Sequence, residues 1–287
     1  MSFFIDISEP IKININLFLE YIVVEFGSVF DAFSSTLISM LVALEKLLVG
    51  IPPPVMILLV GALAFYASRK VGFALCMMLA LYLIGALGVW PESMQTIAIM
   101  LVSVFLSVIM ALPLGVLSAR SDAARKVINP ILDLMQTIPS FVYLIPAAML
   151  FGLGKVPAII ATVIYAAPPL IRLTDLGIRE VNRKVVEASR SFGATKAQIL
   201  QRVQIPLAMP SIMQGLNQTM MMALSMVVIA SMIGARGVGE IVLLGLQRND
   251  AGQGVVGGLA IVVLAVLFDR ITQAAGLRMQ SHRHNPR

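Results

Sequence analysis

The chain has 287 residues, of which 59% are hydrophobic and only 13% are charged, and its mean hydropathy is +0.92. This composition excludes an ordinary soluble domain and predicts a protein embedded in a lipid bilayer. The net charge of +6 is typical of the loops of a membrane protein rather than of nucleic-acid binding. Cys76 is the only cysteine, which excludes a disulfide within the chain and gives no support to a thiolate metal site.

Seven hydrophobic segments are candidates to cross a bilayer, which takes about 20 apolar residues in a helix. They are residues 52–68, 71–89, 94–118, 131–152, 156–174, 207–233 and 254–275. An eighth, weaker helix over 28–49 is interrupted by Asp31, Glu45 and Lys46, so it either crosses the membrane or lies at its surface. The expected fold class is therefore an all-α integral membrane protein with about seven transmembrane helices and an N-terminal amphipathic helix.

The basic residues predict how these spans are oriented, because Lys and Arg collect in cytoplasmic loops. If the Arg69–Lys70 turn is cytoplasmic, most of the 21 Lys and Arg residues fall in cytoplasmic segments. Those left outside are Lys12, Lys46, Lys155, Arg236 and Arg248. We therefore expect the N-terminus outside and the C-terminus inside.

The longest cytoplasmic segment, residues 179–206, is polar and has the pattern of two short helices. The first, near 179–191, should end at Phe192–Gly193, because glycine readily adopts the left-handed conformation that closes a helix. Thr195 and Gln198 match a capping box, which predicts a second helix near 196–204. The corner between the helices should protrude as a small knob, residues 189–194, with Phe192 at its tip.

Part of this segment resembles the EAA loop of ABC importer permeases. The residues that carry the resemblance are Glu187 and Ala188, followed by Ser189 in place of a second alanine, then Gly193, Ala194 and the string Ile-Pro-Leu-Ala-Met-Pro that includes Pro206. From about Trp90 to Ala274 the chain is similar to the permease subunits of glycine betaine, proline betaine and choline importers. The strings that carry this similarity lie at 129–146, 151–157, 168–174, 222–233 and 269–270. Ser189 departs from the family pattern, which has a second alanine there.

The resemblance implies a division of the chain into four parts. A type I importer permease core spans 91–276, preceded by an external segment (1–50) and a peripheral transmembrane hairpin (51–90), and followed by a cytoplasmic tail (277–287). Within the core, residues 179–206 form the coupling loop that docks on a separate ATPase. The contacts expected there are Glu187, Ala188, Ser189, Phe192, Gly193, Ala194 and Pro206. His282 and His284 in the tail lack the further ligands that a metal site needs.

The resemblance also implies the partners and the location of the chain. We expect a homodimer in the bacterial cytoplasmic (inner) membrane, with an ABC ATPase below and an extracytoplasmic substrate-binding protein above. The chain lacks a G-x-x-x-x-G-K-[ST] motif, so ATP and Mg²⁺ should bind to the partner ATPase. We expect no cofactor on this chain, no enzymatic activity of its own and no nucleic-acid partner.

Polar residues in or near the spans indicate a candidate substrate pathway, because an uncompensated polar group is costly in lipid. These residues are Gln136, Thr137, Asn217 and Gln218. A quaternary ammonium group is commonly held by aromatic faces. The aromatic residues nearest to such a pathway are Phe141, Tyr143 and Tyr165, for which packing in the core is an equal alternative. Asp133 is expected to pair with Arg125 or Lys126.

These features together predict the permease of an ATP-driven importer for compatible solutes of the betaine or choline type, which would serve osmoprotection. The nearest alternative is a permease for another small solute, such as an amino acid. An ion-coupled secondary carrier would need carboxylates within the spans, and the sequence shows almost none there. A channel without an energy source would not need the coupling loop.

Overall fold

A computed structural model describes residues 7–284, with side chains through residue 278, and every regular element in that part of the chain is helical. The N-terminal part comprises α1 (Ser8–Gly50), α2 (Pro53–Ser68), α3 (Val71–Ala86) and α4 (Trp90–Arg120). The middle comprises α5 (Asp122–Thr137), η1 (Ser140–Tyr143), α6 (Leu144–Phe151), α7 (Lys155–Arg179) and α8 (Arg183–Ser191). The C-terminal part comprises α9 (Lys196–Ile199), η2 (Leu200–Gln204), α10 (Ile205–Ile229), η3 (Ala230–Ile233), α11 (Val238–Gln247) and α12 (Ala251–His284). The side chains of His282 and His284, on which the tail prediction depends, lie outside the described residues.

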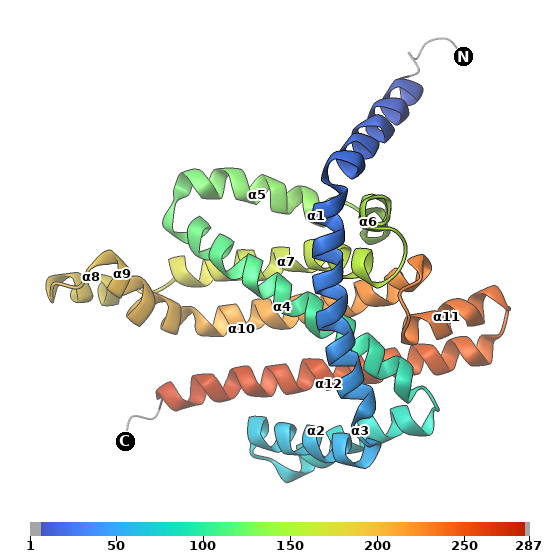
Figure 1. Ribbon diagram of the computed structural model, residues 1–287. Coiled ribbons are helices and arrows are strands. Elements are labelled where there is room, and N and C mark those ends of the chain that lie inside the picture. The colour runs from blue at the N-terminus through green and yellow to red at the C-terminus, as the bar shows by residue number, and fades with distance from the viewer. Residues whose placement is uncertain (1–6, 285–287) are drawn as a thin grey trace, which may run out of the picture.

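The centre of the molecule is a three-helix layer in which α7 packs between α4 and α10 (Figure 1). Small residues at the crossings permit close contact. A Cβ atom added at Gly115 would lie 2.6 Å from the Thr174 side chain, and one at Gly177 would lie 2.7 Å from that of Ser211. The interhelical contacts therefore need glycine at these positions, because a larger side chain would force the backbones apart.

Five helices in the described chain are long and apolar enough to cross a membrane, or six if the bent α5–α6 pair is one span. They are Ser8–Gly50, Trp90–Arg120, Lys155–Arg179, Lys196–Ile233 and Ala251–Arg278. The expected helices at 52–68 and 71–89 are present as α2 and α3, but each has only 16 residues. At 1.5 Å per residue such a helix is about 24 Å long, which is shorter than a typical hydrocarbon core. The fold class is confirmed as an all-α membrane protein.

The predicted span over 131–152 is broken, because the chain bends by 108° between α5 and the η1–α6 segment. Ile138 leaves the helical conformation, with φ −71° and ψ 128°, and Pro139 follows it. A residue before proline is sterically disfavoured in the helical region, which explains why α5 ends here.

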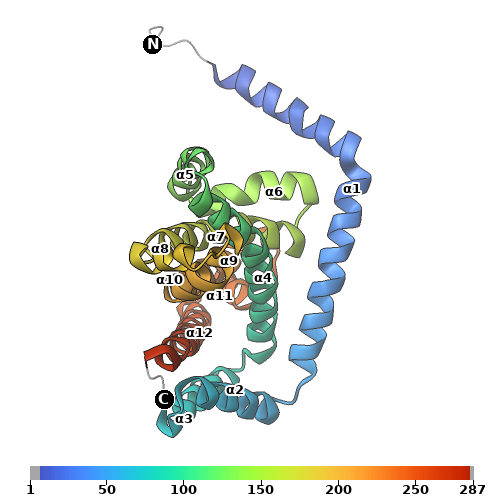
Figure 2. The same ribbon diagram turned by 90° about the vertical axis from the view of Figure 1, so that its left-hand side faces the viewer.

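The N-terminal helix is longer than the predicted 28–49 segment, since α1 has 43 residues and begins at Ser8. It runs steeply across the other helices and is bent, as Figures 1 and 2 show. Only Leu37 and Leu41 of α1 are buried, while apolar side chains such as Phe18 and Val24 are exposed. Glu45 is one of the charged residues that interrupt the predicted 28–49 helix. It forms a half-buried ion pair with Lys155, whose Nζ lies 2.6 Å from the Glu45 Oε1.

Helix α11 was not predicted, because its ten residues are too few to register as a span. It forms a tight hairpin with α12, where a Cβ atom at Gly245 would lie 2.6 Å from the backbone nitrogen of Gly254. At the opposite end of the bundle lie the α8–α9 corner, the α2–α3 turn and the C-terminal part of α12, all on the left of Figure 1. The basic turns predicted to be cytoplasmic therefore share one end of the molecule.

Candidate functional site

The knob is built by local capping. Asn182 begins α8, since its Oδ1 accepts a hydrogen bond from the Lys184 amide at 3.0 Å. Gly193 ends it in the left-handed region, at φ +82°. The amide groups of Gly193 and Ala194 donate to the carbonyl oxygens of Arg190 and Ser189, at 2.9 and 3.1 Å. The predicted role of glycine at this corner is confirmed.

The predicted capping box is also present. The Thr195 amide donates to Gln198 Oε1 at 2.8 Å, and the Gln198 amide donates to Thr195 Oγ1 at 3.3 Å. The helix that follows does not stop near residue 204, however. It continues through a π-helical turn, in which the Ile205 amide donates to the Leu200 carbonyl oxygen, directly into α10. Pro206 follows this turn directly, and the wider π-helical turn accommodates its ring and its missing amide hydrogen.

The knob displays its side chains to the outside. Phe192 is 91% exposed, which is unusual for an aromatic side chain, and no residue of α8 is buried. Glu187 and Ala188 are exposed on α8, and Ser189 is half-buried and donates from its hydroxyl to the Val185 carbonyl oxygen. No ion pair involves Glu187 among the residues that the structure describes. The face expected to contact the ATPase is thus free in this chain.

A buried acid that was not predicted from the sequence, Asp175, connects the start of the coupling loop to the neighbouring helices. The Asp175 side chain, on α7, is 6% exposed. Its Oδ1 accepts from Arg179 Nε at 2.9 Å, and its Oδ2 lies 3.0 Å from Arg125 Nε as an ion pair. Arg179 also contacts Asp122 Oδ1 at 2.7 Å and donates to the Ser118 carbonyl oxygen at 2.8 Å.

This cluster, which we name the Asp175 clamp (Ser118, Asp122, Arg125, Asp175 and Arg179), joins the end of α4, the start of α5 and the end of α7. Arg179 is the last residue of α7, and α8 begins four residues later. The start of the loop is therefore joined to α4 and α5, as well as to α7, through short polar contacts. The Asp175–Arg179 spacing of four residues was the available signal in the sequence, because it places both side chains on one helix face.

The expected pairing of Asp133 with Arg125 or Lys126 is wrong. Asp133 instead forms an ion pair with Arg172 on α7. Arg125 is held by Asp175, as described above. The difference arises because α5 packs along α7, so that acids on α5 find their partners across the helix interface rather than along their own helix.

The predicted pathway residues do not gather at a single cavity. Gln136 and Thr137 are exposed at the end of α5, just before the bend. Tyr143 and Tyr165 are neighbours, with ring centroids 6.1 Å apart. Phe141, which is 55% exposed, lines a separate apolar cleft of about 480 Å³ between α6 and η3.

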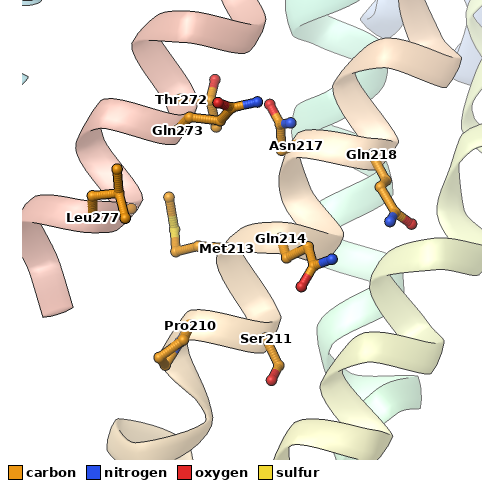
Figure 3. A pocket seen from close by; sticks show the side chains of 10 residues that line it. Pro210, Ser211, Met213, Gln214, Asn217, Gln218, Thr272, Gln273 and Leu277 are labelled. Atoms are coloured by element: carbon orange, nitrogen blue, oxygen red, sulfur yellow. The ribbon is translucent and has the colours of Figure 1, made fainter.

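Asn217 and Gln218 line a polar cleft of about 460 Å³ between α10 and α12 (Figure 3). Asn217 Nδ2 donates to Asp269 Oδ1 at 2.8 Å, and Gln273 Nε2 donates to the same oxygen at 2.7 Å. Figure 3 shows Asn217 and Gln273 pointing toward each other, whereas Gln214 and Gln218 point away from α12. Asp269 is therefore one of the few carboxylates within an apolar helix, and its polar partners explain how it is accommodated.

Comparison with known proteins identifies the class to which this architecture belongs. Residues 111–281 match the family described as "Binding-protein-dependent transport system inner membrane component". The chain is 48% identical over 258 residues to the glycine betaine/proline betaine transport system permease protein ProW of Escherichia coli (strain K12), covering 90% of this chain and 73% of that protein. It is 41% identical to the glycine betaine transport system permease protein OpuAB of Bacillus subtilis (strain 168), covering 95% and 96% of the two chains.

Solved structures agree with the sequence comparison. An inward-facing structure of the MetNI methionine ABC transporter superposes with a TM-score of 0.56 at 25% identity, covering 65% of this chain and 92% of that one. These relatives are components of transport systems rather than enzymes, and the family is described as an inner membrane component. The chain therefore belongs to the family of inner membrane components of binding-protein-dependent transport systems.

Proposed function

We propose that this chain is the permease subunit of an ATP-driven importer for a quaternary-amine compatible solute, namely glycine betaine, proline betaine or choline. Membership of the family implies an ATPase and a substrate-binding protein as partners. The observation that carries the proposal is the knob, an exposed aromatic tip on a locally capped corner that the Asp175 clamp joins to α4, α5 and α7. The betaine or choline substrate is supported by the similarity to ProW and OpuAB.

Coupling works through a rigid connection in this proposal. ATP and Mg²⁺ bind on the separate ATPase chain, whose closure moves a groove that holds the knob. Glu187, Ala188, Ser189, Phe192, Gly193 and Ala194 contact that groove. Arg179 carries the movement to Asp175 and Asp122, and Pro206 lies where the other side of the loop enters α10.

A second copy of the chain completes the pathway. Ser211, Gln214, Gln218 and Ser225 recur at helical spacing on α10, and all but the half-buried Ser211 are exposed. Polar side chains on one exposed face of an apolar helix are costly against lipid, so this face lines the pathway between two copies. In this arrangement lipid surrounds the remaining faces, the N-terminus lies outside and the knob and C-terminus lie inside, as the shared end of the basic turns supports.

Uptake of labelled glycine betaine tests the function. Proteoliposomes would contain the permease with its ATPase and binding protein, with ATP inside and unlabelled choline as competitor. ATP-dependent uptake that resists choline identifies a betaine importer, and uptake displaced by choline moves the substrate to choline. Uptake of an amino acid in place of both would refute the substrate class, and uptake driven by an ion gradient without partners would refute the importer.

Cross-linking tests the dimer independently of the substrate. Gln218→Cys in a Cys76→Ala background should give a cross-linked dimer with a short bifunctional thiol reagent in membranes. Leu79→Cys in the same background is the control, because Leu79 is 67% exposed on the peripheral α3 and faces lipid in this arrangement. Equal cross-linking of the two variants would show that the α10 face is not the dimer interface.

A further inference from the structure

A basic cleft lies between the α2–α3 turn and the C-terminal part of α12, and it shares Gln273 and Leu277 with the lining of the polar cleft. Its volume is about 520 Å³. Four cationic residues line it, Arg69 and Lys70 from the turn and Arg270 and Arg278 from α12, and no carboxylate belongs to its lining. Phe73, Ala274 and Leu277 add an apolar wall beside the charges. We name this feature the basic cleft.

The α2–α3 turn contributes two cations to the lining of the cleft. Arg69 ends α2 in the left-handed region at φ 57°, a conformation that costs free energy for a residue other than glycine. Lys70 is the extended residue before α3, and no side chain caps the amide groups of the first turn of that helix. Uncapped amide groups at a helix N-terminus add partial positive charge to the same place.

The α12 side of the cleft is also ordered by contacts. The Arg278 guanidinium lies over the Tyr66 ring, with its Cζ 4.0 Å from the ring centroid, and Nη1 donates to the Tyr66 carbonyl oxygen. Arg270 Nε is 3.9 Å from Asp269 Oδ2, a weak contact, while the other carboxylate oxygen is occupied by Asn217 and Gln273. The cleft therefore keeps a strong excess of positive charge.

We propose that the basic cleft binds the headgroup of an anionic phospholipid. A phosphate diester satisfies convergent Arg and Lys donors, and the acyl chains can lie on Phe73 and Leu277. The outer faces of α2 and α3 favour lipid, since Leu63, Tyr66, Leu75 and Leu79 are exposed there. The proposal requires only that the Arg69–Lys70 turn lie at a membrane surface, and it does not depend on which solute is transported.

The place of the cleft in the fold favours lipid over the ATPase as its occupant. Figures 1 and 2 both show α12 lying between α10 and the α2–α3 pair. The knob, where the proposed ATPase docks, follows α7 on the other side of α12 from this pair. The basic cleft thus lies between α12 and the peripheral α2–α3 pair, where lipid is the nearest source of phosphate.

Native mass spectrometry of the full chain in detergent tests the proposal. The chain is titrated with phosphatidylglycerol or with phosphatidylcholine of the same acyl chains, and the bound lipids are counted. We expect one phosphatidylglycerol to bind more tightly than any phosphatidylcholine. Arg69→Gln together with Lys70→Gln should weaken that binding by about thirtyfold, given the usual contribution of each basic residue near an anionic lipid. Arg270→Gln alone should weaken it about fivefold.

A charge-matched control removes two cations elsewhere. Arg183→Gln with Lys184→Gln lowers the net charge equally on exposed α8 and should leave phosphatidylglycerol binding unchanged. Unchanged phosphatidylcholine binding and a monodisperse elution profile show that each variant is folded. Equal weakening in both double variants would overturn the proposal, because charge alone would then explain the binding.

The source of the phosphate is tested by competition. Millimolar inorganic phosphate or glycerophosphoglycerol should fail to displace the lipid, because neither has acyl chains to place on the apolar wall. Displacement of the lipid by either would assign the cleft to a free anion and would overturn the lipid assignment. Loss of ATPase association in the Arg69→Gln/Lys70→Gln variant with lipid binding intact would assign the cleft to the partner protein instead.

Discussion

The coupling loop and the α4–α7–α10 core differ in what determines their shape. The loop is shaped by hydrogen bonds between near neighbours, at Asn182, Gly193 and Thr195, and α8 buries none of its side chains. The core is shaped by close packing, with glycines at 115 and 177 where another helix leaves no space for a methyl group. The two regions should therefore fail differently, the loop by losing contact with a partner and the core by losing its fold.

Gly193→Asp should have the largest effect on transport, reducing uptake to background while the permease stays folded in the membrane. The backbone φ of +82° disfavours a side chain, and a carboxylate would be added beside Phe192 at the docking tip. No atom lies within 4 Å of the added Cβ position, so folding has no steric obstacle there. Uptake into proteoliposomes and the thermal stability of the purified chain measure the two properties.

Gly193→Asn is the matched control for that variant. Asparagine has nearly the same shape as aspartate, carries no charge and tolerates the left-handed conformation better than most residues. We expect it to retain part of the uptake. If both variants transport at the rate of the parent chain, the knob does not couple ATP hydrolysis to transport.

Gly115→Ala tests the core. In contrast to Gly193→Asp, it should lower the stability of the chain first and transport only as a consequence. The new methyl group would lie 2.6 Å from Thr174 Cβ and 2.9 Å from the Ile171 carbonyl oxygen, so α4 and α7 must separate. Overpacking of this kind lowers the free energy of unfolding by about 1–3 kcal/mol. Gly258→Ala, at a helical position with no atom within 4 Å, should be neutral or slightly stabilising, and thermal denaturation in detergent compares the two.

Asp175→Asn acts where the two regions meet, so it should lower both stability and coupling. It leaves Arg179 and Arg125 without a buried counter-charge. The cost should be about 2 kcal/mol, below that of a fully buried pair because Arg125 and Arg179 are 40% and 27% exposed. Uptake per folded permease should fall by more than stability alone explains.

Asp122→Asn removes a carboxylate from the same Arg179 but from an 80% exposed position. An exposed ion pair contributes little, so we expect a loss below about 1 kcal/mol and nearly normal uptake. Equal effects of the two variants would show that burial at Asp175 is not what gives the clamp its strength.

The features that were predictable from the sequence are those determined by neighbouring residues. Gly193 and the Thr195–Gln198 capping box could be predicted because their hydrogen bonds join residues a few positions apart. The long spans could be predicted because hydropathy is a sum over one segment. The bend at Pro139 was predictable in part, because proline disfavours a continuous helix. Hydropathy, however, contains no information on the direction that the chain takes after the proline.

The features that were missed depend on helices packing together. Glu45 and Lys155 are 110 positions apart, so no local pattern shows that this acid is compensated. Asp269 is accommodated by Asn217 from another helix, and Asp133 pairs with Arg172 rather than with a cation on its own helix. The role of the candidate pathway residues is a property of the assembled dimer, so it stays a prediction.

The smallest expected effect is that of a stop codon after Arg278, which should leave transport and stability unchanged. The linings of the polar cleft and of the basic cleft extend no further than Leu277 and Arg278. A stop codon after Ile271 is the contrasting variant, because it removes Thr272, Gln273 and the remaining α12 residues of both clefts. We expect that chain to lose uptake and to denature at a lower temperature. If the stop codon after Arg278 already abolishes transport at normal expression, the histidine-containing tail takes part in transport. Residues beyond 278 would then belong to the functional part of the chain.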